Sequence, residues 1–385
     1  MLPVLARRSW PRWFNGCMST PALFRPIQLG SLTVRNRAWV SPMCQYSVEQ
    51  RDGVVNDWHL VHYGSLAAGG FGLVVVEATG VSPEARISPW DAGLWNDQQA
   101  TAWRRVTDFA HAQGAAIGVQ LAHAGRKAST NRWWPGEEAR NIPADEGGWT
   151  PVGPTTERGA GEEFTSEVQA LDEAGIQKVI DDFAAAAVRA KEAGFDLVEV
   201  HAAHGYLLHQ FYSPLSNTRT DQWGGSWENR TRLLLAVVDA IRQVWTGALA
   251  VRISATDWTD GDWTDGGWDG EDSAQLAIEL REHGVDLVDV STGGLVMARI
   301  PVGPGYQVPY AEQVRSESGV VTSAVGMITE PEQAEQIIAE GRADAVMLAR
   351  QALREPGWPL RAAHELGLPA DQAPWPPARS RGVWR

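Results

Sequence analysis

Cysteine is scarce in this sequence, and its scarcity excludes several classes of protein. The 385 residues include 2 cysteines, Cys17 and Cys44. Two cysteines are too few for a disulfide framework or for a cysteine-rich metal cluster. We therefore expect a protein of the reducing cytoplasm that holds no structural metal.

Long apolar runs and positive charge are lacking as well. No apolar stretch approaches the roughly 20 residues that span a bilayer, which excludes an integral membrane protein. The 33 lysine and arginine residues face 47 acidic residues, so the formal net charge is −14. Such a chain repels the phosphates of nucleic acids. We expect neither a nucleic-acid partner nor a membrane partner.

The sequence does contain one pattern that recurs along its length. A helical segment ends in a glycine, and a short run rich in β-branched residues follows within a few positions. These glycines are Gly70, Gly114, Gly194, Gly284, Gly319 and Gly341. The strands expected from the apolar runs are 40–43, 73–76, 115–120, 195–200, 248–253, 285–290, 320–325 and 343–348. Mostly apolar strands indicate a parallel sheet that is covered on both faces.

Eight such alternations predict a single (β/α)8 TIM barrel over residues 21–370. A doubly wound sheet is the alternative fold, but it calls for a G-x-G-x-x-G motif after its first strand, and the sequence has none. Residues 1–20 carry arginines without acids and are expected to form a disordered leader. Residues 371–385 contain Pro374, Pro376 and Pro377 and are expected to form an extended tail.

Two segments interrupt the pattern directly after predicted strands. Residues 123–171 are rich in glycine, proline and charge, and residues 257–272 hold seven acids and three tryptophans. Loops that follow barrel strands lie on the active-site face, so both segments are lid candidates. For 257–272, a solvated surface loop is an equal alternative.

The ends of the predicted strands carry polar groups that a purely structural barrel does not need. His201 and His204 are three residues apart and can face one point, where two imidazoles can polarise a carbonyl oxygen. Tyr206 follows as a possible proton donor. The same two histidines could instead hold zinc, with Glu199 as a third ligand. The spacing alone leaves both chemistries open.

A second group of residues indicates a phosphorylated ligand. Gly293, Gly294, Gly326 and Arg350 follow predicted strands six, seven and eight, where barrels commonly bind phosphate. Arg252 ends strand five and would be an unpaired buried cation unless a ligand meets it.

The longer motifs resemble one known family. The run from His201-Ala-Ala-His204-Gly-Tyr206 through Asn217-Thr-Arg219 to Gly224-Gly225-Ser226 is similar to the Old Yellow Enzyme signature. Ser41-Pro42-Met43-Cys44-Gln45-Tyr46 resembles the thermophilic-like class of these ene-reductases. The similarity extends over residues 23–353.

The resemblance implies FMN across the barrel mouth and a role for each matching residue. Gln120 and Arg252 would bind the pyrimidine edge, and Arg252 would stabilise negative charge there. His201 and His204 would bind the oxygen of an activated alkene, and Tyr206 would protonate its α carbon. Cys44 would tune the flavin potential and contact substrate. The further FMN contacts would be Pro42, Met43 and Ala78 at the ring and Gly294, Gly326, Ala349 and Arg350 at the phosphate, with Tyr46 lining the substrate pocket.

The implied activity is reduction of activated alkenes with NADPH or NADH as the hydride source. The resemblance further implies a homodimer or homotetramer in which Arg381 reaches a neighbouring active site, although the tyrosine of that tail motif is missing. No cysteine follows Cys44, so we expect the barrel without a fused iron–sulfur domain. The alternatives are a metal-dependent barrel hydrolase using His201 and His204, and a non-catalytic barrel that binds a phosphorylated ligand.

Overall fold

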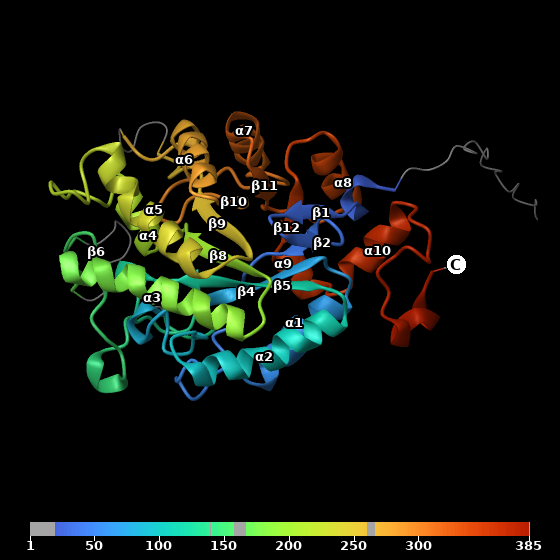
Figure 1. Cartoon of the computed structure of the whole chain (residues 1–385), viewed down its shortest axis with the longest axis horizontal. Coiled ribbons are helices and arrows are strands. Elements are labelled where there is room, and N and C mark those ends of the chain that lie inside the picture. The colour runs from blue at the N-terminus through green and yellow to red at the C-terminus, as the bar shows by residue number, and fades with distance from the viewer. Residues whose placement is uncertain (1–19, 139, 158–166, 260–265, 385) are drawn as a thin grey trace, which may run out of the picture.

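The predicted single TIM barrel is confirmed. The computed structural model describes residues 20–138, 140–157, 167–259 and 266–384. Eight parallel strands close into a barrel in chain order, surrounded by helices (Figure 1). The barrel strands are β3 (Ala38–Val40), β4 (Leu73–Gly80), β5 (Ala116–Ala122), β8 (Leu197–Ala202), β9 (Ala248–Ser254), β10 (Leu287–Ser291), β11 (Val321–Ala324) and β12 (Ala345–Leu348).

Several helices begin or end where the local sequence provides caps. The six glycines that mark predicted helix ends all have positive φ, the conformation that glycine adopts most readily. In α2, Asn96 and Gln99 form a capping box that satisfies the first backbone N–H groups. The helices are α1 (Asp57–Ala68), α2 (Asp97–Ala112), α3 (Glu173–Glu192), α4 (Leu207–Tyr212), α5 (Trp227–Val244), α6 (Gly270–Glu282), α7 (Val308–Ser318), α8 (Pro331–Ala339), α9 (Arg350–Arg354) and α10 (Trp358–Glu365).

The strand boundaries differ from the predicted ones. The first barrel strand ends at Val40 rather than at residue 43. Pro42 has no backbone N–H to donate to a neighbouring strand, which limits the pairing there. Strand β4 continues to Gly80 instead of ending at residue 76, because it keeps pairing with β5 beyond a register shift between Val76 and Ala78.

A two-stranded hairpin closes the amino-terminal end of the barrel. Strands β1 (Ile27–Leu29) and β2 (Leu32–Val34) are antiparallel. Leu29 and Val34 are buried in an apolar cluster with the first residues of several barrel strands, Leu73 and Leu197 among them. The open side of the barrel is therefore the opposite one, at the carboxyl ends of the strands.

The insertion at residues 123–171 is ordered in its described part. It contains the 3-10 helices Gly125–Lys127 and Ala144–Glu146 and the short parallel strands β6 (Val152–Gly153) and β7 (Gln169–Ala170). The Arg132 guanidinium lies between the rings of Trp134, at 4.0 Å, and Trp90, at 4.7 Å. These cation–π contacts attach the insertion to the segment after β4.

The acidic stretch 257–272 does not behave as a uniformly solvated loop. Residues 260–265 lie outside the described part of the chain. Asp257 and Trp268, on either side of them, are both 1% exposed. At least one residue on each side of the undescribed segment is therefore buried.

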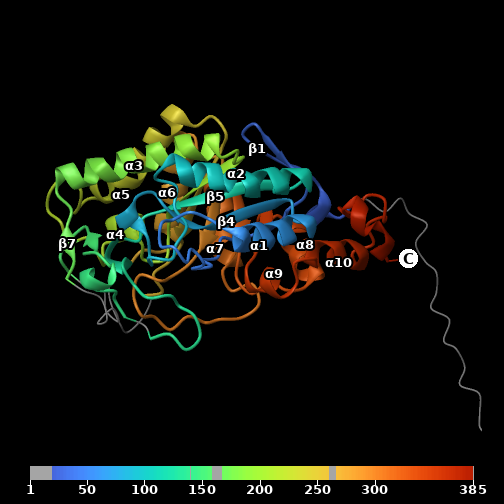
Figure 2. The same cartoon turned by 90° about the horizontal axis from the view of Figure 1, so that it is seen from below.

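The carboxyl-terminal tail departs from the extended arm expected for residues 371–385. Pro377–Gly382 form a 3-10 helix. Trp384 stacks on His364 of α10 with ring centroids 5.2 Å apart, and it also contacts Trp375. This aromatic packing keeps the tail beside α10 (Figures 1 and 2). The expected leader lies outside the described residues, apart from Thr20. Within the described ranges, no helix has the length and apolar character to cross a membrane.

Candidate active site

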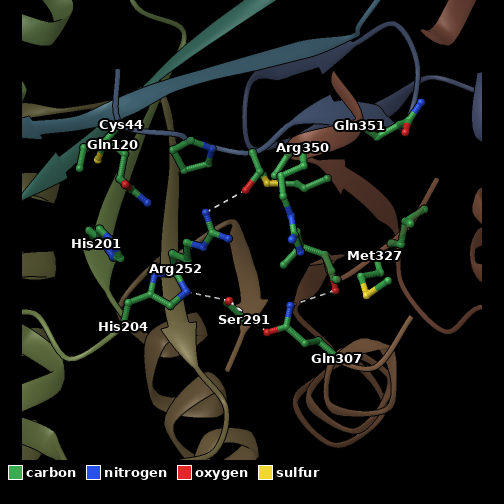
Figure 3. Close-up of a pocket in the computed structure, with 18 of the residues that line it drawn as sticks. Cys44, Gln120, His201, His204, Arg252, Ser291, Gln307, Met327, Arg350 and Gln351 are labelled. Carbon is green, nitrogen blue, oxygen red and sulfur yellow. Dashed lines mark hydrogen bonds between the residues drawn. The ribbon is translucent and has the colours of Figure 1, made fainter. Parts of the chain in front are cut away.

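A cavity of about 360 Å3 opens at the carboxyl ends of the barrel strands (Figure 3). The structure brings most of the predicted site residues to this one cavity, although they come from seven of the eight strand ends. The predicted residues that line it are Pro42, Cys44, Ala78, Gln120, His201, His204, Tyr206, Arg252, Gly326, Ala349 and Arg350.

Four predicted residues do not line this cavity. Tyr46 is buried in an adjoining apolar cluster that Cys44 and Tyr206 also contact. Met43 packs against the main core, and Arg381 is exposed in the tail. A Cβ atom on Gly294 would lie 2.7 Å from Cα of His204. Gly294 therefore permits a close approach to the histidine turn, which is a different role from the expected phosphate contact.

His201, His204 and Tyr206 form a compact group at the end of β8. The ring centroid of His201 lies 5.2 Å from that of His204 and 5.0 Å from that of Tyr206. Burial and the charge of Arg252 hold the pKa of both histidines well below the usual value of 6.5. Burial also raises the pKa of Tyr206. Two neutral imidazoles and a protonated phenol therefore face the cavity.

The two histidines differ in their hydrogen bonding. Nε2 of His204 lies 2.7 Å from Oγ of Ser291, and that hydroxyl donates to Gln307. Nδ1 of His201 is buried and has no hydrogen-bond partner among the described residues. A neutral imidazole has a single N–H. A ligand oxygen that accepts from Nε2 of His204 must therefore replace Ser291, whereas His201 has no hydrogen bond at Nδ1 to give up.

The expectation that Arg252 is an unpaired cation is wrong. Its Nε lies 3.1 Å from Oδ2 of Asp289, and its Nη1 donates to Oγ of Ser41. Glu199 is buried nearby and accepts a hydrogen bond from Nε2 of Gln120 at 2.8 Å. Burial and the charge of Asp289 raise the pKa of Glu199 to about 8. Two buried carboxyl groups thus share one cation, which favours the protonated form of Glu199.

The zinc alternative gains no support from this arrangement. Glu199 is engaged with Gln120 and lies in the field of Arg252. Across the described ranges, no group of three histidine, cysteine or carboxylate side chains is placed to hold a metal ion.

The segment that carries Cys44 is fixed by a buried carboxylate. Glu77 accepts from the backbone N–H of Gln45 at 2.8 Å and from the Tyr63 hydroxyl at 2.9 Å. Burial and the charges of Asp91 and Glu77 raise the pKa of the Cys44 thiol. Cys44 therefore meets the cavity as a neutral thiol rather than a thiolate.

The opposite end of the cavity is cationic. Arg350, at the start of α9, and Arg354 both line it, together with Gly326, which has a φ of 119°. Figure 3 shows Arg350 on one side of Arg252 and the two histidines on the other. This cavity fits FMN, because Gln120 and Arg252 can meet a polar ring edge while Arg350 and Arg354 can meet a phosphate.

Several site residues escaped the sequence reasoning. Asp289 could have been recognised from the sequence, because it is a charged residue inside the apolar strand β10. Ser291 ends the same strand. Gln307 lies 15 residues beyond Thr292, to which its side chain is hydrogen-bonded, and nothing in the local sequence marks it.

Comparisons with known proteins agree with this geometry. The model of the NADH:flavin oxidoreductase / NADH oxidase family matches residues 22–368. The chain is 47% identical over 347 residues to an NADPH dehydrogenase of Listeria innocua, covering 90% of this chain and 95% of the relative. It is also 47% identical over 349 residues to an NADPH dehydrogenase of Geobacillus thermodenitrificans, with the same coverage. Among solved structures, morphinone reductase superposes with a TM-score of 0.75 at 31% identity over 91% of both chains.

Proposed function

Because this chain belongs to the NADH:flavin oxidoreductase / NADH oxidase family, also called the Old Yellow Enzyme family, we propose that it reduces the C=C bond of activated alkenes. The chain is an FMN-dependent oxidoreductase with a nicotinamide reductant. The observation that carries the alkene assignment is the group of two neutral histidines and one protonated tyrosine beside a cavity that fits a flavin.

Bound FMN would supply the hydride transfer from NADPH or NADH to the β carbon of the alkene. We assign Gln120 and Arg252 to the pyrimidine edge, with Pro42 and Ala78 near the ring. Arg350, Gly326 and Ala349 hold the phosphate. Support for this orientation comes from the ion pair with Asp289, which fixes the Arg252 guanidinium in place.

On the substrate side, His201 and His204 bind the oxygen that activates the alkene and withdraw electron density from its β carbon. Tyr206 then donates its phenolic proton to the α carbon, and solvent protons replace it. The raised pKa of Tyr206 keeps that proton in place until carbanion character develops. Tyr46 shapes the adjoining apolar wall with Cys44.

We expect FMN to co-purify with the chain in about one copy per subunit. The reason is that one cavity contains both the arginines that can bind a phosphate and the side chains of Gln120 and Arg252. Heat release, chromatography and absorbance measure the identity and amount of the flavin. FAD in place of FMN, or a colourless protein that neither binds added FMN nor reduces cyclohexenone, would contradict the proposed function.

Replacing Cys44 with alanine is expected to keep the fold and FMN content and to shift the flavin reduction potential. The neutral thiol lies in the cavity lining, so its removal changes the polarisability near the ring without leaving a charge. A redox titration and the rates of the two half-reactions measure the change. Unchanged values of all three would leave Cys44 with a packing role only.

We further propose a cytoplasmic homo-oligomer in which Arg381 contributes to a neighbouring substrate pocket. Arg379 and Arg381 are exposed on the tail, which Trp375 and Trp384 pack into a compact unit. Arginine and tryptophan are frequent anchors of interfaces. Truncation after Gln372 should reduce the mass in solution and raise KM, whereas Arg381→Ala should raise KM alone. If the truncated chain has the same mass in solution and the same KM as the parent, the tail contributes neither to the oligomer nor to the substrate pocket.

A further inference from the structure

A third buried histidine lies directly behind the turn that carries His204 and Tyr206. His209, in α4, accepts the backbone N–H of Gly205 at its Nδ1, with a distance of 2.9 Å. A ring nitrogen that accepts carries no hydrogen, so the hydrogen of the neutral ring is on Nε2. That Nε2 lies 3.0 Å from Oδ1 of Asp257, a close polar contact outside ideal hydrogen-bond geometry, and both side chains are fully buried.

Asp257 is held as a carboxylate by its surroundings. Its other oxygen, Oδ2, accepts from the Ser213 hydroxyl at 2.7 Å and from the backbone N–H of Trp268 at 3.1 Å. Burial alone would raise the pKa of Asp257, but the proximity of His209 and these hydrogen bonds hold it below the usual value. Asp257 is also the first residue of the acidic stretch 257–272, whose role the alkene chemistry leaves open.

The turn that His209 contacts has a backbone conformation that needs support. His204 has a φ of 57°, in the left-handed region that non-glycine residues seldom adopt, and Gly205 follows with 73°. The carbonyl of Gly205 accepts from Nε2 of Gln210 at 2.7 Å. The N–H of Gly205 is thus hydrogen-bonded to His209 and its C=O to Gln210. Its two neighbours in the chain, His204 and Tyr206, face the cavity.

We propose that Asp257 and His209 act as a positioning pair: Asp257 fixes the tautomer of His209, and His209 thereby holds the turn that sets His204 and Tyr206 at their working separation. This inference rests on the proposed function, since it concerns the residues that bind and protonate the alkene. Neither member of the pair lines the cavity. Their influence on the reaction passes through Gly205.

The substitution Asp257→Asn tests the tautomer directly. The backbone N–H of Trp268 can only donate, so the amide oxygen of the new side chain must take the Oδ2 place. Its NH2 group then faces Nε2 of His209 and moves the ring hydrogen to Nδ1, where it opposes the N–H of Gly205. The shape of the side chain is retained, while the hydrogen bond that holds the turn is lost.

His209→Asn provides a rescue. Its Oδ1 occupies nearly the place of Nδ1 and can accept from Gly205 whatever stands at position 257. His209→Gln places its amide near the former Nε2 and leaves Gly205 without an acceptor. The exposed Glu271→Gln, in the same acidic stretch, is the matched control for the loss of one negative charge.

We expect Asp257→Asn and His209→Gln to lower kcat for cyclohexenone by about 100-fold, the order that a displacement of about 1 Å can cause. FMN content should be unchanged. His209→Asn and the double variant Asp257→Asn/His209→Asn should remain within about threefold of the parent protein, as should Glu271→Gln. A double variant as slow as Asp257→Asn, or Asp257→Asn at the parent rate, would overturn the proposal.

A measurement without turnover separates this proposal from the proposed function. Nitrogen-15 spectra of the histidines in the FMN-loaded protein report which ring nitrogen carries hydrogen. The parent should show His209 with hydrogen on Nε2, and Asp257→Asn should move it to Nδ1. An Nδ1–H tautomer of His209 in the parent would contradict the proposed role of Asp257 and His209 even if the enzyme reduces alkenes. The expected tautomers with no alkene reduction would instead count against the proposed function.

Discussion

Replacement of His201 or His204 with alanine is expected to lower kcat/KM for cyclohexenone by about 100- to 1000-fold, the range seen when one oxyanion donor is removed. Both rings are neutral. His201 is buried against Tyr206, and His204 is half-buried against His201. Each can therefore give one hydrogen bond to the carbonyl oxygen, and a hydrogen bond in a partly desolvated site is stronger than the same bond in bulk water. Steady-state kinetics and the affinity for a phenol ligand measure the loss.

The two variants should differ in their effect on phenol binding. In the parent protein, the ring of His201 has no hydrogen-bond partner at Nδ1. The ring of His204 must first break its hydrogen bond with Ser291 before it can bind a ligand. We expect the larger loss of affinity in His201→Ala. FMN content should stay near that of the parent, and His283→Ala, at a half-buried position that does not line the cavity, serves as the control. Either variant reducing cyclohexenone at the parent rate would remove that histidine from the assigned role.

Replacement of Glu199 with glutamine is expected to remove one contribution to the pH dependence of stability. The pKa of Glu199 is raised from 4.5 to about 8 in the folded chain by burial and by Asp289. Between these two pH values the folded state holds a proton that the unfolded state has released, so the free energy of unfolding of the parent falls as pH rises. A tenfold difference in proton affinity between the two states corresponds to about 1.4 kcal/mol, which makes the total effect a few kcal/mol.

Glutamine mimics the protonated carboxyl and can still accept from Gln120. The variant should therefore match the parent near pH 4.5 and exceed it in stability by a few kcal/mol near pH 8. Asp91, whose pKa is also raised to about 8 by burial, contributes equally to both proteins and cancels in the difference. Urea unfolding at both pH values tests this, with the exposed Glu282→Gln as control. A constant difference across pH would show that Glu199 is ionised in the folded state.

The sequence alone determined the barrel and the face on which the site lies. Glycines at the helix ends and apolar strand runs specify the order of elements through local preferences that need no tertiary contact. In a parallel barrel all strands end on the same face. Gln120, His201, Arg252 and Arg350 could thus be assigned to one cavity, although 230 residues separate the first from the last.

The tertiary structure alone decided which of those side chains pair with one another. Gln120 stands opposite Glu199 in the register of β5 and β8, and Arg252 stands opposite Asp289 in that of β9 and β10. A register is fixed by the packing of whole strands, and a shift of one residue would reverse the direction of every side chain. The strand sequences contain these residues but not their alignment. For that reason the charge state of Glu199, the partner of Arg252 and the support of the His204 turn by His209 followed only from the fold.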